Sequence, residues 1–129
     1  MSTSATAALR KAVRGLLFMS EIDAPFKVVK LKEMPSKRTI ASQLGLPDDS
    51  HVEEISPTKF FADLTKHEKW HAEDDKAVIK RYQDLLAVLR EHLTGLKVYK
   101  VGRVRVKIEI VGKTPADEIV GLETDALET

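Results

Sequence analysis

Apolar residues recur at helical spacing near the start of the chain and again in its second half. The first stripe consists of Leu9, Val13, Leu16 and Leu17. Its i, i+4, i+7, i+8 spacing predicts a helix that buries one face, with Ser4 or Thr6 as the N-cap. The second stripe consists of Val78, Tyr82, Leu85, Leu86, Leu89 and Leu93. It predicts a longer helix that begins near Asp74 and that Gly95 ends.

A strict alternation of apolar and polar residues follows the second helical stripe. Val104, Val106, Ile108 and Ile110 alternate with Arg103, Arg105, Lys107 and Glu109. This period of two predicts a strand with one face in the core and the other in water. Because a polar face does not suit a sheet that is covered on both sides, we expect this strand at an edge of the sheet.

Shorter patterns predict the remaining elements. Residues 26–31 indicate a short strand introduced by Pro25, and residues 39–44 indicate a brief helix that Gly45 ends with a positive φ. Residues 112–115 indicate a turn, and residues 118–128 one more strand. Helices at the front and middle, with strands between and after them, predict a single α+β domain over residues 1–129, an antiparallel sheet covered by helices.

Composition narrows the setting of this domain. The 129 residues include no cysteine, which favours a reducing compartment and excludes a thiol nucleophile. The longest uninterrupted apolar run, residues 85–89, is too short to span a membrane, and residues 1–6 lack the features of a signal peptide. We therefore expect a cytoplasmic protein that does not bind membranes.

The formal net charge is only +1, but the charges are sorted along the chain. Residues 97–113 are strongly basic, whereas residues 116–129 contain no base. The acids of this last stretch are Asp117, Glu118, Glu123, Asp125 and Glu128. The pattern predicts an anionic C-terminal tail.

Residues 67–71 read HEKWH, which fits the H-E-x-x-H pattern of zinc peptidases. Such a motif needs a buried helix around it and a third ligand downstream, and apolar residues are too sparse between residues 65 and 76 to provide that helix. We therefore interpret HEKWH as a chance match on a solvated connector. The sequence also contains neither a G-x-S-x-G elbow nor a G-x-G-x-x-G loop, and we expect neither an enzyme nor a cofactor.

Two further features leave alternatives open. The cations Arg103, Arg105 and Lys107 form either the solvated face of a strand or a nucleic-acid-binding face. Trp70, the only tryptophan, is surrounded by charged residues, so it either folds back onto the core or stands out as an anchor for a partner.

Several segments together resemble the nuclease A inhibitor family, whose members block sugar-nonspecific endonucleases of the ββα-metal type. These segments are GLLFMSE and APF within residues 15–26, FFADLT at residues 60–65 with the nearby tryptophan, and VYKVGRVRVKIEIVGKTPADEIVGLETDALET at residues 98–129. The resemblance covers nearly the whole chain and preserves the order of the segments.

The resemblance implies a three-layer α-β-α sandwich around a mainly antiparallel sheet and a 1:1 complex with a magnesium-dependent endonuclease. The free protein would be a monomer with no cofactor and no direct contact with nucleic acid. The expected partner-binding residues are Glu21, Glu68, Trp70, Glu128 and Thr129. The resemblance also implies that the Thr129 hydroxyl reaches the magnesium ion of the nuclease, and it favours Trp70 as an exposed anchor.

Elementary chemistry is compatible with this mode of binding. Magnesium takes oxygen ligands in an octahedron and keeps several exchangeable waters, so the Thr129 hydroxyl could replace one of them. Because an active site that binds polyphosphate is cationic, acids at Glu123, Asp125 and Glu128 would mimic the charge of the substrate.

Overall fold

The computed structural model describes residues 5–19, 23–64 and 73–127. Within these residues the helices are α1 (Ala5–Val13), α2 (Ile40–Gln43), α3 (Pro57–Leu64) and α4 (Glu73–His92). The strands are β1 (Leu17–Met19), β2 (Asp23–Pro25), β3 (Lys27–Leu31), β4 (Val52–Ile55), β5 (Thr94–Val101), β6 (Arg105–Lys113) and β7 (Ile119–Leu127). No helix in the described part of the chain is long and apolar enough to cross a bilayer.

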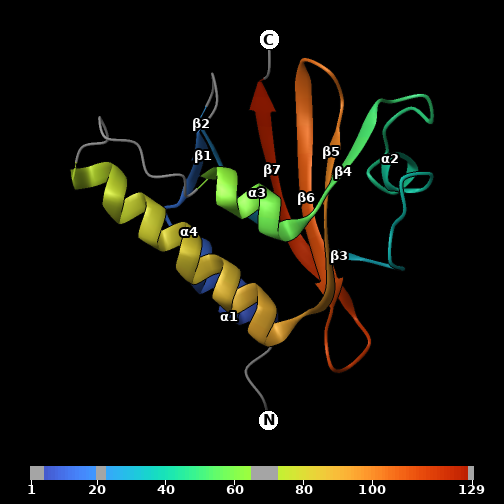
Figure 1. Ribbon diagram of the computed structural model, residues 1–129. Helices are drawn as coiled ribbons and strands as arrows, with labels where there is room; N and C mark the ends of the chain where they lie inside the picture. Colours follow the sequence, from blue (N-terminus) through green and yellow to red (C-terminus); the bar gives the residue numbers. More distant parts are fainter. Residues whose placement is uncertain (1–4, 20–22, 65–72, 128–129) are drawn as a thin grey trace.

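A five-stranded antiparallel sheet in the order β3-β7-β6-β5-β4 is the centre of the molecule (Figure 1). Strands β6 and β7 form a hairpin that is paired along its whole length, from Arg105 opposite Leu127 to Lys113 opposite Ile119. Strands β1 and β2 form a separate two-stranded hairpin. The structure confirms the α+β class.

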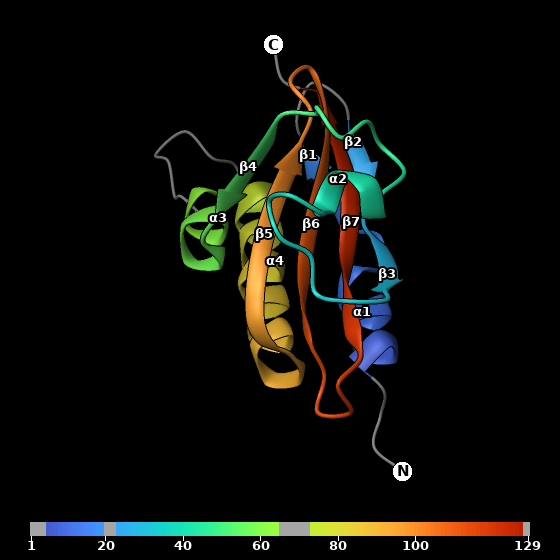
Figure 2. The ribbon, with the colours of Figure 1, turned by 90° about the vertical axis from the view of Figure 1, so that its right-hand side faces the viewer.

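The two faces of the sheet bury different sets of residues. On one face α1, α3 and α4 pack on the even-numbered residues of β6, which include Val106, Ile108 and Ile110. On the other face the short helix α2 packs with Tyr99, Val101 and Val111. Figure 2 shows α2 in front of the sheet and α4 and α1 behind it. The first face is covered by much more helical structure than the second.

The structure corrects our interpretation of the alternating stretch at residues 103–110. Its strand begins only at Arg105, and Val104 lies in the preceding turn with 54% of its surface exposed. The strand is central rather than at an edge, because β5 and β7 pair on its two sides. Its polar face is only partly in water, since Arg105 is exposed, Lys107 is half-buried and Glu109 is fully buried.

Local spacing predicted the first helix at the right place but too long. Helix α1 ends at Val13, and the chain turns before Leu16. Leu16 is still buried, but Leu17 belongs to β1 and is 40% exposed. Three other elements agree with the predictions within a few residues: the long helix at residues 73–92 and the strands at 27–31 and 119–127. Gly45 has the expected positive φ, 73°.

Candidate functional site

The C-terminal strand leaves the sheet from an interior position. Strand β7 pairs with β6 as far as Leu127, whereas β3 covers its other side only up to Glu123. Beyond that point hairpin β1–β2 lies beside β7, where the Thr124 hydroxyl donates hydrogen bonds to the carbonyl oxygens of Pro25 (3.0 Å) and Ala24 (3.4 Å). The path of the chain up to Leu127 is therefore set by backbone pairing and by this buried threonine.

An aromatic cluster fixes the hairpin to the helices. The ring of Phe18 in β1 stacks on Phe60 of α3 at 6.1 Å and meets Phe26 edge-on at 6.3 Å. Phe26 in turn packs against Tyr82 of α4, whose hydroxyl donates to the Leu17 carbonyl. These buried rings connect β1, α3 and α4. Sequence reasoning did not identify this cluster, although Phe18 and Phe60 belong to the segments that carried the resemblance.

All five predicted partner-binding residues lie outside the described residues. Glu21 belongs to residues 20–22, Glu68 and Trp70 to residues 65–72, and Glu128 and Thr129 end the chain. The HEKWH segment falls within residues 65–72 as well. The described elements that border these segments lie in one half of the molecule: the top of hairpin β1–β2 and the end of β7 at its top, and the end of α3 and the start of α4 lower and to one side (Figure 1). The fold thus brings the borders of three distant segments into the same half of the molecule.

Two of the acids expected in the anionic tail form ion pairs within the sheet. The Lys107 ammonium on β6 lies 3.2 Å from a carboxylate oxygen of Asp125 and 3.8 Å from one of Glu123. Burial would lower the pKa of Lys107, but the hydrogen bond that its ammonium donates to Asp125 and the charges of Glu123 and Asp125 outweigh burial and raise that pKa. Glu123 and Asp125 therefore share one lysine within the sheet, which offsets only part of their negative charge.

The two remaining described acids of this stretch lie elsewhere. Asp117 and Glu118 belong to the turn between β6 and β7, at the opposite end of the sheet from Leu127. They form ion pairs with Lys113 (3.4 Å) and Lys30 (3.3 Å), respectively. The fifth acid of the stretch, Glu128, lies outside the described residues.

Glu109 occupies an unusual position on β6. It lies opposite Glu123 on one side and Tyr99 on the other, and neither of its carboxyl oxygens has a hydrogen-bond partner among the described residues. The Tyr99 hydroxyl donates instead to the Pro35 carbonyl. Burial, and next the charge of Glu123, raise the pKa of Glu109 to about 9. Glu109 is therefore a neutral acid at pH 7, inside the sheet.

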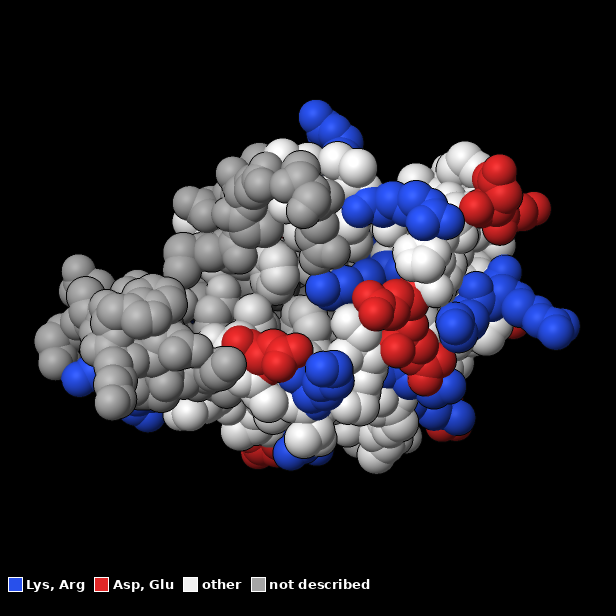
Figure 3. Space-filling model, turned by 45° about the horizontal axis from the view of Figure 1, so that its top comes forward, with Lys and Arg blue, Asp and Glu red and all other residues white. Residues whose placement is uncertain are grey.

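The structure argues against a basic strand face for nucleic acid. Of the three cations proposed for it, Lys107 is engaged by two carboxylates, and Arg103 lies in the turn before the strand. Figure 3 looks onto the end where β7 terminates, and both acidic and basic side chains occur there. Binding of a phosphate backbone is favoured by a cluster of cations without interspersed acids.

A family model described as nuclease A inhibitor-like protein matches residues 3–129. The chain belongs to this family. Among proteins with curated descriptions, none matches it. The match confirms the resemblance found in the sequence.

Proposed function

We propose that this protein inhibits a sugar-nonspecific, magnesium-dependent endonuclease by placing its C-terminal end in the active site. The observation that carries the proposal is the family match over residues 3–129. It is supported by the position of β7, which delivers the C-terminus from an interior strand beside the β1–β2 hairpin. In this proposal the protein is not an enzyme and binds one nuclease molecule.

A plug on an interior strand suits an inhibitor because its direction is already fixed before binding. Strand β7 is paired up to Leu127, and two further residues add at most about 7 Å of extended chain. A short end of this kind loses little conformational entropy when it binds, which favours affinity. The Thr129 hydroxyl would replace one exchangeable water of the magnesium ion, and the terminal carboxylate would add a negative charge.

The other expected contacts surround this plug. In the proposal Glu21 pairs with a cation of the nuclease, and Trp70 is the apolar anchor. Glu68 and Glu128 add acidic contacts beside Trp70 and Thr129, respectively. Segments 20–22 and 65–72 are bordered by elements that the Phe18–Phe60 stack holds together. A rigid base of this kind lets separate segments act as one binding surface.

The direct test is inhibition of plasmid digestion. The purified protein is mixed in molar excess with each of several sugar-nonspecific ββα-metal endonucleases, with magnesium present. We expect at least one nuclease to be inhibited with a 1:1 end point. Undiminished digestion by every nuclease of the panel would refute the proposed function.

The position of the plug is tested separately by extending the chain. Four residues, Gly-Ser-Gly-Ser, are added after Thr129, and the same four residues are added at the N-terminus as the matched control. The C-terminal extension should raise the inhibition constant at least 100-fold, because the metal pocket must then accommodate additional chain, whereas the N-terminal extension should leave it unchanged. Equal potency of the two proteins would exclude the C-terminus as the plug.

A further inference from the structure

The turn between β5 and β6 has a sterically constrained backbone and presents an exposed apolar side chain. Gly102 has a φ of +118°, and a Cβ at this position would lie 2.1 Å from the Arg105 carbonyl oxygen. Its backbone N–H donates to the His51 carbonyl at 2.8 Å, which ties the turn to the segment before β4. Val104 is nevertheless 54% exposed at the tip. A large apolar side chain on a fixed turn is a preorganised contact.

This turn lies at the level where the chain ends. Strand β6 runs antiparallel to β7, and the last pair joins Arg105 to Leu127. Residues before Arg105 therefore continue past Leu127 in the direction of the C-terminus, and Figure 1 shows the turn at the same end of the molecule as the end of β7. Neighbouring strands are about 4.8 Å apart, and two residues reach at most about 7 Å. A protein that binds at the end of β7 is therefore close to this turn.

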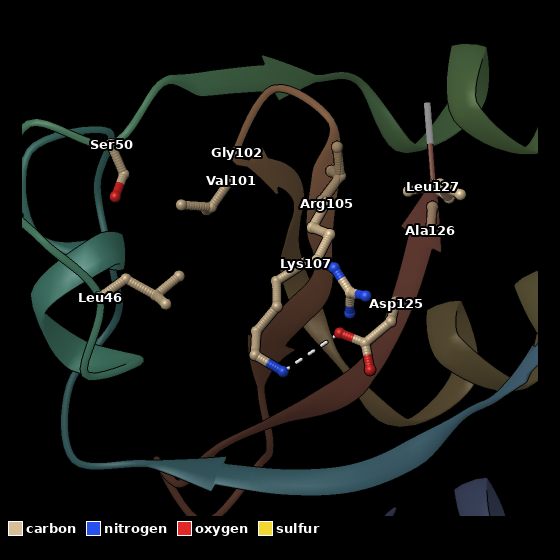
Figure 4. A pocket seen from close by; sticks show the side chains of 10 residues that line it. Leu46, Ser50, Val101, Gly102, Arg105, Lys107, Asp125, Ala126 and Leu127 are labelled. Atoms are coloured by element: carbon tan, nitrogen blue, oxygen red, sulfur yellow. Dashed lines mark hydrogen bonds and ion pairs between the residues drawn. The ribbon is translucent and has the colours of Figure 1, made fainter. Parts of the chain in front are cut away.

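A cavity of about 470 Å³ adjoins the turn and has walls of mixed character. Its lining includes Leu46, Val101, Gly102, Arg105, Ala126 and Leu127. Figure 4 shows that Leu46 comes from the segment after α2 and that the other side chains come from the ends of β5, β6 and β7. The cavity has room for an apolar side chain of a partner, next to the end of β7.

The charge beside this cavity selects a class of partner surface. Arg103 and Arg105 are exposed and flank Val104, and neither forms an ion pair within residues 5–19, 23–64 and 73–127. Lys107, which also lines the cavity, is already neutralised by Asp125. Two unpaired arginines around one apolar residue complement carboxylates around an apolar side chain.

We infer that the turn Gly102–Arg105 and its cavity form a second nuclease contact, which recognises an acidic, partly apolar segment on the rim of the nuclease active site. This inference rests on the proposed function and adds a specificity determinant to it. The nuclease cleft itself attracts a polyanion, so the two arginines fit the rim and not the cleft. Nucleases whose rim is basic at this place would be repelled, which restricts the protein to partners with carboxylates there.

The test reverses two charges at each end of the sheet. Arg103→Glu with Arg105→Glu changes the turn, and Lys30→Glu with Lys113→Glu changes two exposed cations at the opposite end by the same net charge. Both double variants are measured against the nuclease that the wild-type protein inhibits best, at low and at physiological salt. We expect the turn variant to bind at least tenfold more weakly at low salt, with a smaller deficit at higher salt, and the control to match wild type. Val104→Asp should weaken binding as well.

Each other outcome decides against a particular claim. If wild type inhibits a nuclease and the turn variant is equally potent or tighter, the second contact is refuted while the proposed function stands. If wild type inhibits no nuclease, the proposed function fails and this inference fails with it. If the protein alone shifts plasmid DNA in a salt-dependent way that the turn variant abolishes, the arginines serve nucleic acid and the inference is refuted. Far-ultraviolet circular dichroism checks that both variants are folded.

Discussion

Replacing Glu109 with glutamine isolates the effect of one buried carboxyl group on stability. Glu109 is fully buried on β6, and neither carboxyl oxygen has a hydrogen-bond partner within the described residues. Burial, and next the charge of Glu123, raise its pKa from 4.5 to about 9. Glutamine has nearly the same shape as the protonated acid, cannot ionise, and can donate a hydrogen bond to the Glu123 carboxylate opposite it.

The sign of the effect follows from proton binding. Between pH 4.5 and about 9 the folded state holds a proton on Glu109 that the unfolded chain has released. The free energy of unfolding therefore falls as the pH rises through this window, by about 1.4 kcal/mol per pH unit. This carboxyl alone removes about 3 kcal/mol of stability between pH 4.5 and pH 7 as an upper limit, because relaxation and water entry reduce the penalty. Glu109→Gln removes this loss.

Urea unfolding at several pH values measures the effect. The free energy of unfolding of Glu109→Gln should exceed that of wild type, and the gap should widen by up to about 4 kcal/mol between pH 5 and pH 8. Glu91→Gln, an exposed acid on α4, is the matched control and should keep the wild-type pH dependence. Parallel curves for wild type and Glu109→Gln over this range would refute the reasoning that Glu109 is protonated in the folded state.

Three further substitutions test the plug and the elements around it. Thr129→Val keeps the shape of the side chain but removes its hydroxyl, so we expect an inhibition constant at least tenfold higher than that of wild type. Thr129→Ser keeps the hydroxyl and should inhibit about as well as wild type. Equal inhibition constants for the two variants would contradict the magnesium contact. Gly102→Ala brings a Cβ 2.1 Å from the Arg105 carbonyl oxygen and should cost about 2 kcal/mol or more in urea unfolding, and an unchanged midpoint would contradict the strain. Phe60→Ala removes one ring from the aromatic cluster and should lower the free energy of unfolding by about 3–5 kcal/mol. Lys59→Ala, on the exposed side of α3, is the control and should lower it little. Similar losses in both variants would contradict the role of the Phe60 ring in stability.

The amino-acid sequence determined the elements whose signal is local. The stripe that ends at Leu93 marks the face of α4 that is buried, because residues one turn apart share a side of a helix whatever they pack against. The alternation at Val106, Ile108 and Ile110 likewise marks the buried face of β6. The segments from GLLFMSE to the C-terminus also identified the family, which the match over residues 3–129 confirms. Periodicity and segment order need no knowledge of neighbouring strands.

Tertiary structure decided what depends on neighbours distant in the sequence. The alternation in β6 predicted that its polar residues face water. In the structure β6 lies between β5 and β7, Glu109 is buried, and Lys107 forms ion pairs with Asp125 and Glu123. Strand β5 escaped prediction because residues 94–101 lack a strict alternation of apolar and polar residues, and its place in the sheet is fixed by pairing with β4 and β6. Hairpin β1–β2, α3, the start of α4 and the end of β7 come to the same half of the molecule only once the sheet has formed. Local periodicity indicates which side of an element is apolar, whereas the partner that covers each side is chosen by long-range packing.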